Sequence, residues 1–187
     1  MNPSWHLPAT FERKLEDNPT FNNYYPEGDS IRVVYKEGVF VGYRGYEQNG
    51  VKPLYPFGYG LSYTTFKYAN LAVAPVAGGS GLHYKVSFDV TNTGQRAGAT
   101  VAQVYVAEAH ASVPRPPKEL KGFERVALKA GETKHVSVEL DGRAFAFYDV
   151  AGKDWKVDGG EFGILVGDNS ADTPLTSKVQ VKEAVVE

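Results

Sequence analysis

The side chains best suited to chemistry in this sequence are its histidines, carboxylates and serines, because the chain has no cysteine. A metal site requires several ligands at a recognisable spacing. No such spacing relates the four histidines, which are His6, His83, His110 and His135. Glu108 and His110 lie two positions apart, but a pair supplies too few ligands for a tetrahedral or six-coordinate ion. The sequence therefore predicts no metal site and no bound cofactor.

A serine nucleophile normally sits on a sharp strand-to-helix turn with glycine two residues away on either side. Ser112, Ser137 and Ser170 all lack this context. Serine hydrolase chemistry is therefore not supported by the sequence.

The loop Arg115-Pro116-Pro117-Lys118-Glu119 presents two cations on a backbone made rigid by proline. One interpretation is that Arg115 reaches an active-site mouth or a second subunit and donates a bidentate hydrogen bond. The other is that Arg115 and Lys118 hold the loop against its own domain or a neighbouring one. We favour the structural interpretation, because most ion pairs of this kind only position the chain.

The elements that carry these residues are predicted to be strands. Side chains at 82, 84, 86, 88 and 90 are apolar and alternate with polar ones, which places one face of a strand in a core. His83 and His135 fall on the outward faces of such strands. Further strands are expected at 66–73, 99–108, 119–128, 136–140, 155–157, 162–166 and 177–181, and a short aromatic segment lies at 145–148. About seven or eight strands without intervening helices predict an all-β sandwich.

Turn signals separate these strands. Asn92-Thr93-Gly94 is expected to turn the chain, and Ala130-Gly131-Glu132 reads as a hairpin turn. The prolines at 114, 116 and 117 exclude a hydrogen-bonded ladder in the loop that contains them.

Residues 53–65 form an aromatic stretch that is rich in proline and glycine and precedes the first predicted strand. Two prolines and two glycines exclude a helix or a central strand. Its aromatic side chains are too numerous for a solvated linker, because each has a large apolar area to bury. We interpret this stretch as a connector packed on both sides.

Residues 1–52 are rich in turns. Phe11–Glu16 is expected to form a turn or two of helix, and two short strands are predicted at 31–35 and 39–43 across a turn at 36–38. Several prolines and few local ladders indicate that residues 1–30 lie along a partner surface. Exposed aromatic side chains are expected on residues 1–60.

Composition excludes several classes of function. The net charge is −2, with 20 basic and 22 acidic residues, so no strong field attracts nucleic acid or an anionic membrane. Apolar runs are far shorter than a membrane span, and the first residues lack the features of a signal peptide. The absence of cysteine fits either redox compartment, so localisation stays open.

The sequence Pro56-Phe57-Gly58-Tyr59-Gly60-Leu61-Ser62-Tyr63-Thr64-Thr65-Phe66 resembles the signature that leads into the C-terminal fibronectin type III-like domain of glycoside hydrolase family 3 enzymes. Four flanking segments are similar to the same family in the same order. They are Asn2-Pro3-Ser4 with Leu7-Pro8-Ala9-Thr10-Phe11, Val41-Gly42-Tyr43-Arg44-Gly45-Tyr46, Arg115 to Phe123, and Gly160-Glu161-Phe162. The sequence departs from the family at Trp5 and His6, because the family usually has a small residue followed by a basic residue at these two positions.

The resemblance implies a division into three parts. Residues 1–52 would be the C-terminal remnant of an α/β sandwich domain, 53–65 the connector, and 66–187 the fibronectin type III-like β-sandwich. The partners implied are the N-terminal barrel and α/β domains of the same enzyme, in cis or as a separate chain, with a homo-oligomer as a further option. Domain-docking side chains are expected where the family packs one domain on another; they are Tyr43, Tyr46, Tyr55, Phe57, Tyr59 and Tyr63.

The family hydrolyses β-glycosides with retention, which requires two carboxyl groups about 5–5.5 Å apart. The resemblance places these groups in an N-terminal barrel and a middle domain, and neither motif occurs here. Asp154-Trp155 is similar to the nucleophile pair but sits between a glycine turn and a strand. We therefore assign no catalytic residue and expect a non-catalytic part of a β-glucosidase. A β-xylosidase parent and a stand-alone carbohydrate-binding module are the alternatives.

Overall fold

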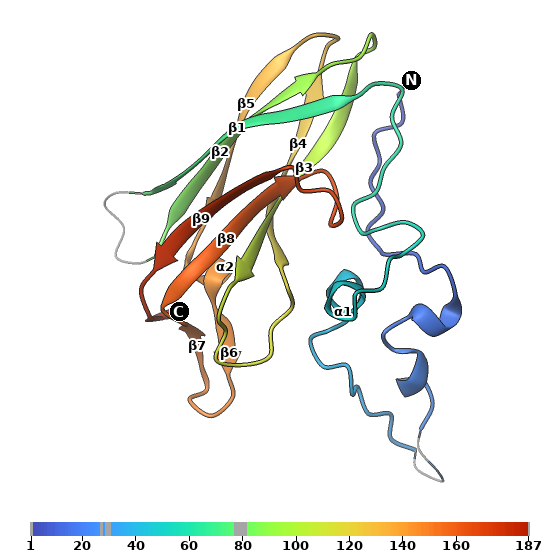
Figure 1. The fold of residues 1–187 in the computed structure, drawn as a ribbon, viewed down its shortest axis with the longest axis vertical. Coiled ribbons are helices and arrows are strands. Elements are labelled where there is room, and N and C mark those ends of the chain that lie inside the picture. Colours follow the sequence, from blue (N-terminus) through green and yellow to red (C-terminus); the bar gives the residue numbers. More distant parts are fainter. Residues whose placement is uncertain (1, 27, 29–30, 77–81, 187) are drawn as a thin grey trace.

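The computed structural model describes all residues except 1, 27, 29–30, 77–81 and 187. Two antiparallel sheets form a sandwich (Figure 1). One sheet has the order β1-β2-β5, with β1 at Phe66–Pro75, β2 at Tyr84–Asn92 and β5 at Thr133–Leu140. The other has the order β4-β3-β8-β9, with β4 at Glu119–Leu128, β3 at Gly98–Glu108, β8 at Gly160–Gly167 and β9 at Leu175–Val181. The all-β sandwich expected from the sequence is confirmed.

The core lies between the two sheets and follows the predicted alternation. Val86, Phe88 and Val90 of β2 are fully buried and face Val104 and Ile164 of the opposite sheet within one apolar cluster. Burying side chains of this size stabilises the fold by about 1.5–3 kcal/mol each. The sandwich therefore has its own core.

Strand β3 is buried on both faces. Ala102, Val104 and Val106 belong to the sandwich core, whereas Gln103 and Tyr105 point the other way and are also buried. Their cover is the N-terminal part of the chain, because Tyr43 contacts the Tyr105 ring. The outer face of the four-stranded sheet is thus partly an internal surface.

A small third sheet of order β10-β7-β6 closes one end of the sandwich. It consists of β6 at Phe147–Asp149, β7 at Asp154–Val157 and β10 at Ala184–Val186. The short helix α2 at Gly142–Phe145 precedes it, and Asp141 caps α2 by accepting a hydrogen bond from the Ala144 amide at 3.2 Å. This cap aims Phe145 into the core.

The described part of residues 2–65, which we call the N-terminal limb, lies on one side of the sandwich (Figure 1). The start of the limb runs antiparallel to its own last residues, through hydrogen bonds from the Leu7 amide to the Tyr59 carbonyl and from the Phe11 amide to the Tyr55 carbonyl, both 2.8 Å. The helix expected at 11–16 is wrong, because Phe11 is held in this pairing. The helical turns are 3₁₀, η1 at Leu15–Asp17 and η2 at Phe21–Asn23.

The two strands predicted at 31–35 and 39–43 are also wrong. The described residues there form bends, turns and irregular backbone, and helix α1 occupies Tyr43–Gln48. Gly42, with φ +54°, reverses the chain and accepts the first helical hydrogen bonds. No described residue at 31–35 or 39–43 pairs in a sheet, and Ile31 is 97% exposed, so strand propensity is not supported here by packing.

The turn at Ala130-Gly131-Glu132 exists, but it does not make a hairpin. Gly131 has φ +74°, and the turn carries the chain from β4 in one sheet to β5 in the other. Turn residues indicate a change of chain direction and do not indicate which strands then pair.

Among the described residues, no helix has the length and apolar character needed to cross a bilayer.

Candidate functional site: the seam between limb and sandwich

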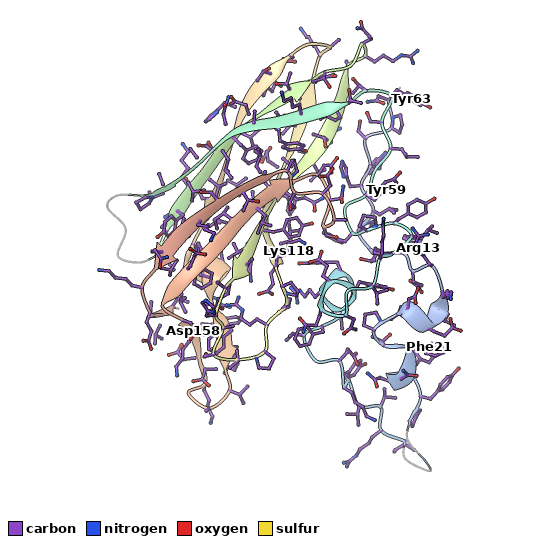
Figure 2. The ribbon with its side chains drawn as sticks, in the orientation of Figure 1. Arg13, Phe21, Tyr59, Tyr63, Lys118 and Asp158 are labelled. Atoms are coloured by element: carbon purple, nitrogen blue, oxygen red, sulfur yellow. The ribbon has the colours of Figure 1, made fainter. Side chains whose placement is uncertain are left out.

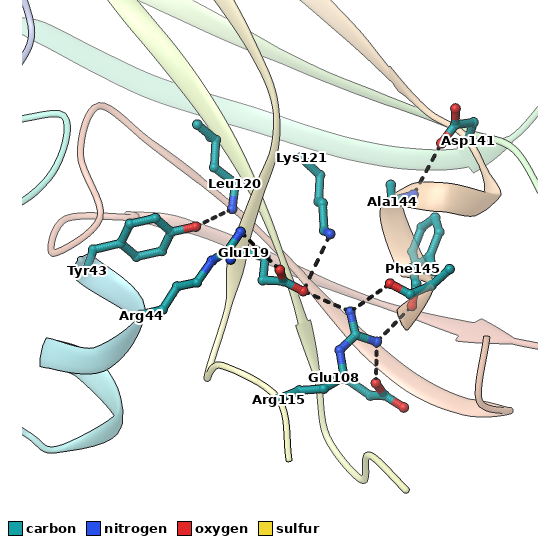
Figure 3. Close-up of polar contacts among 11 residues, drawn as sticks. Tyr43, Arg44, Glu108, Arg115, Glu119, Leu120, Lys121, Asp141, Ala144 and Phe145 are labelled. Carbon is teal, nitrogen blue, oxygen red and sulfur yellow. Dashed lines mark hydrogen bonds and ion pairs between the residues drawn. The ribbon is translucent and has the colours of Figure 1, made fainter. Parts of the chain in front are cut away.

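The limb and the sandwich meet along a contact that we call the seam, made by α1 and Phe57 on one side and by β3, β4 and the loop at 115–118 on the other. Tyr43 stacks on Phe57 with ring centroids 5.1 Å apart and meets Tyr105 edge-on at 6.0 Å. Its hydroxyl accepts a hydrogen bond of 2.8 Å from the Leu120 amide (Figure 3). One tyrosine therefore supplies both apolar and polar contact.

Arg115 occupies the centre of a charged network beside the seam (Figure 3). Its guanidinium lies 2.6 Å from Glu108 Oε2 and 2.9 Å from Glu119 Oε2, and it donates to the Phe145 carbonyl at 2.8 Å. The side chain is 9% exposed. Its partners are on β3, β4 and α2, so Arg115 joins three elements of the sandwich and does not point into solvent.

Glu119 extends this network to the limb. Its Oε1 lies 3.2 Å from an Arg44 nitrogen, and its Oε2 lies 3.4 Å from Lys121 Nζ. Burial opposes ionisation of Glu119, but the Arg115 hydrogen bond and the charges of Lys121, Arg115 and Arg44 outweigh it and lower the carboxyl pKa. For Glu108 the balance is reversed, because burial raises its pKa despite Arg115.

A second ion pair crosses the seam directly. Lys118 Nζ lies 2.8 Å from Glu47 Oε2 of α1 and 5.7 Å from the centre of the Tyr105 ring. Burial raises the pKa of Glu47, with Lys118 opposing it. The other carboxylate oxygen, Oε1, is buried and makes no hydrogen bond, as is true of Thr10 Oγ1. Both residues line a cavity of about 370 Å³ together with Lys118.

Side-chain hydrogen bonds join the start of the chain to the edge of β3 that is left open before the pairing with β8 begins at Gln103. Ser4 Oγ accepts from the Ala99 amide and His6 Nε2 accepts from the Val101 amide, both at 3.2 Å. Because Nε2 is an acceptor, the His6 ring donates from Nδ1, to the Gly58 carbonyl at 2.5 Å. Asn2 Oδ1 accepts from the Tyr63 amide at 2.7 Å. Sequence reasoning misses these roles, and the one signal that points to them is the motif Asn2-Pro3-Ser4.

Gly58 shows why the connector contains glycine at this point. Its φ is +84°, and a Cβ there would lie 2.3 Å from Gln103 Nε2. Gln103 is buried and donates to the Asp168 carbonyl at 2.8 Å. The backbone of the connector therefore contacts the sheet at a distance that only glycine permits.

The six predicted docking aromatics are distributed over different surfaces. Tyr43 and Phe57 lie in the seam, whereas Tyr46 is buried within the limb, where its hydroxyl donates to Glu12 Oε2 at 3.1 Å. Tyr55 and Tyr59 pack on each other with centroids 5.1 Å apart, and Tyr63 is largely exposed. Figure 2 shows Tyr59 and Tyr63 on the limb and Lys118 on the sandwich side of the seam.

The other residues considered for chemistry in the sequence, Asp154, His83 and His135, make local contacts within the sandwich. Asp154 accepts a hydrogen bond from the Trp155 amide at 2.8 Å, and the Arg143 guanidinium lies 3.6 Å from the centre of the Trp155 ring. His83 and His135 are on outward faces beside Glu139 and Asp89, respectively. Across the described ranges, no group of three or more ligating side chains is placed to hold a metal ion.

Exposed apolar side chains are concentrated on the limb. Those on the sandwich are Val113, Phe123, Tyr148, Val150 and Val185. Those on the limb are more numerous and larger on average: Trp5, Phe11, Leu15, Phe21, Tyr24, Tyr25, Ile31, Val33, Val34, Tyr35, Val39, Val41, Leu54, Tyr55, Leu61 and Tyr63. Such a density of exposed apolar area marks an interaction surface.

Comparisons with known proteins match both a part of the sandwich and the chain as a whole. Residues 100–170 match the fibronectin type III-like domain family. Thermostable β-glucosidase B of Acetivibrio thermocellus is 48% identical over 99% of this chain and 24% of its own length. An exo-α-(1→6)-L-arabinopyranosidase of Bifidobacterium breve is 42% identical over 97% of this chain and 23% of its own. The crystal structure of a GH3 β-glucosidase from Bifidobacterium adolescentis matches with a TM-score of 0.91 and 40% identity, over 98% of this chain and 26% of that one.

The two-sheet fold that starts at Phe66 and the family match at 100–170 together define a fibronectin type III-like β-sandwich. The chain as a whole corresponds to the C-terminal part of a glycoside hydrolase family 3 enzyme. It spans about a quarter of the length of the relatives it matches. Those relatives carry the matched part within a longer single chain.

Proposed function

We propose that this chain is a non-catalytic C-terminal part of a β-glucosidase of family 3, and that it supports the catalytic barrel and α/β domains by docking on them in cis. The observation that carries the proposal is the concentration of exposed apolar side chains on the limb, in a chain that matches only 24% of a relative's length. The sandwich, in contrast, has a closed core and few exposed apolar side chains.

The charged groups of the seam support a structural role. Arg115 forms ion pairs with Glu108 and Glu119. Lys118 forms an ion pair with Glu47. A retaining glycosidase needs two free carboxyl groups facing a substrate. The buried carboxylates of the seam are instead engaged with cations, so their geometry positions α1 on the sandwich.

The sugar preference of the parent enzyme is then set outside this chain. Relatives named as a β-glucosidase and as an exo-α-(1→6)-L-arabinopyranosidase both match nearly all of it at more than 40% identity. A part that is shared between enzymes with different substrates is suited to supporting the catalytic domains, and is not suited to selecting the sugar substrate. β-Glucosidase is the parent activity that we favour, and β-xylosidase is the alternative.

The test is a chimera in which this chain replaces the matching part of the Acetivibrio thermocellus enzyme. We expect no hydrolysis of an aryl β-glucoside by the isolated chain and full hydrolysis by the chimera. A truncated enzyme without the part should lose activity or thermal stability. Turnover by the isolated chain, or a truncated enzyme as stable and active as the chimera, would contradict the proposal. Retardation of the isolated chain on β-glucan, cellulose or xylan gels would favour a carbohydrate-binding module instead.

A further inference from the structure

The cavity beside α1 contains two polar atoms to which the protein itself gives no hydrogen bond. They are Glu47 Oε1 and Thr10 Oγ1, which are both buried and belong to residues that line the same cavity of about 370 Å³. A buried polar atom without a partner costs free energy, so two of them at one place require an explanation. A molecule bound in the cavity would supply the hydrogen bonds that both atoms lack.

The size and the walls of this cavity are those of a small-molecule site. Such sites are about 300–1,000 Å³ in volume and combine apolar or aromatic walls with a few convergent polar groups. A single water needs only about 30 Å³, so one bridging water would leave most of the space unfilled. Two aromatic residues and two prolines contribute to the walls; they are Tyr43, Tyr46, Pro53 and Pro56.

The ion pair between Glu47 and Lys118 limits the charge that a ligand could carry. Lys118 Nζ lies 2.8 Å from Glu47 Oε2, so the pair as a whole is neutral (Figure 2 shows Lys118 on the side of the sandwich that faces α1). A cationic ligand beside Oε1 would be repelled by Lys118, and an anionic ligand would be repelled by Glu47. Both repulsions are strong in a partly buried site, where water screens charges poorly. A neutral ligand avoids both.

The two atoms without partners determine which polar groups the ligand must have. A carboxylate oxygen only accepts, so the ligand must donate a hydrogen bond to Glu47 Oε1, whereas the Thr10 hydroxyl can donate or accept. Burial raises the pKa of Glu47, and Lys118 and the buried Ser170 only partly offset this effect. The carboxylate would therefore gain from a further donor. Several hydroxyl groups on one small molecule meet these requirements, and the C–H groups between them suit the aromatic wall.

We propose that this cavity binds a neutral polyol no larger than one pyranose sugar, through hydroxyl groups at Glu47 Oε1 and Thr10 Oγ1. Solvent reaches the site past Gly50, Lys52 and Ala171, which border the cavity and are exposed. The cavity has walls from the limb and from the sandwich, so the bound polyol stabilises the contact between them. The proposal concerns residues of this chain alone and does not depend on the proposed function.

Titration of the isolated chain with D-glucose, followed by NMR of the backbone amides, tests the proposal. We expect chemical-shift changes that saturate and are confined to residues around the cavity, such as Gly50, Val51 and Ala171. Protonated glucosamine and glucuronate have the same ring with one charge each, and they should bind about tenfold more weakly or not at all. Changes that never saturate and spread over the whole chain would reflect a solvent effect of the sugar. Water would then be the occupant, and the proposal would be wrong.

Thr10→Val removes the hydroxyl and keeps the branched shape of the side chain. It should weaken glucose binding about 3–10-fold, as expected for one lost hydrogen bond. It should not lower the thermal midpoint of the sugar-free chain, because this hydroxyl has no partner in the protein. Thr176→Val, at an exposed position of β9, is the matched control and should change neither quantity. Unchanged affinity in Thr10→Val, or a lower midpoint without sugar, would contradict the proposal.

Val51→Phe tests the cavity without removing a polar group. The larger side chain should occupy part of the space and weaken glucose binding more than tenfold, while the ion pair between Lys118 and Glu47 is kept. Undiminished binding by a folded Val51→Phe chain would place the sugar elsewhere and overturn the proposal. If this variant does not fold, Thr10→Val decides the question. A negative result with the isolated chain leaves the proposed function standing, because that function is tested by the activity of the chimera.

Discussion

Lys118 Nζ lies 2.8 Å from Glu47 Oε2 and joins residues that are 71 positions apart in the sequence. This ion pair crosses the seam between α1 and the loop that precedes β4. Both side chains are mostly buried, so the pair is less screened than a surface ion pair. It is one of the few places where a single substitution on the sandwich should loosen the limb.

We expect Lys118→Met to lower the free energy of unfolding by about 1–3 kcal/mol, between the effects typical of exposed and of buried pairs. The loss has a clear cause, because Glu47 would keep a buried charge with no partner. Glu47→Gln combined with Lys118→Met should recover part of it. Urea unfolding of both single variants and the double variant measures the coupling; a coupling of zero would show that the pair contributes nothing.

Arg115 should be sensitive even to a conservative change. Arg115→Lys keeps the charge but cannot bridge Glu108 and Glu119 with a planar fork, so we expect a loss of about 2 kcal/mol. Arg115→Met should cost about 3–5 kcal/mol, because the buried Glu108 loses its cation and Glu119 keeps only Arg44 and Lys121. Arg125→Lys, at an exposed position on the same sheet, should stay within about 0.5 kcal/mol. Thermal or chemical denaturation compares the three, and an equal effect at both arginine positions would argue against the network.

Glu119 and Glu108 should give opposite pH dependences. The folded-state pKa of Glu119 is lowered from 4.5, so its contribution to stability is present above that pH and is lost as the pH falls through the lowered value. Glu119→Gln should therefore flatten the decline of stability below about pH 4.5. The folded-state pKa of Glu108 is raised, so its ionisation costs stability as the pH rises through the raised value. In Glu108→Gln that decline above about pH 4.5 should be absent, and unfolding measured from acid to neutral pH would show it.

Gly58→Ala tests the close approach of the connector to β3. The left-handed backbone alone costs alanine about 1–2 kcal/mol, and contact of the new Cβ with the buried Gln103 side chain adds about 1–3 kcal/mol. Gly131→Ala has a similar φ of +74° but no atom within 4 Å, so it should show the backbone cost alone. Equal destabilisation of the two variants would mean that Gln103 moves aside freely.

The sandwich could be predicted from the sequence because its signals are local. Alternation over Val86, Phe88 and Val90 fixes which face of β2 is buried, and the bounds expected for Glu119–Leu128 are those of β4. The family signature at 56–66 located the end of the connector next to β1, which starts at Phe66. The division of residues 1–65 into a domain remnant and a connector stays a prediction.

The limb could not be predicted in the same way, because its conformation depends on what it contacts. Residues 31–35 have strand propensity but no neighbouring strand, and Tyr43 to Gln48 form a helix that packs on Tyr105. Likewise, Arg115 and Lys118 could be singled out from the proline-rich loop, whereas their partners Glu108, Glu119 and Glu47 are set by strand pairing and by the seam. Side-chain alternation and turn chemistry depend on neighbouring residues, so the sequence determined most of the strands and the all-β sandwich class. Partners distant along the chain are brought together only by packing, so the tertiary structure decided the strand pairing, the seam and its ion pairs.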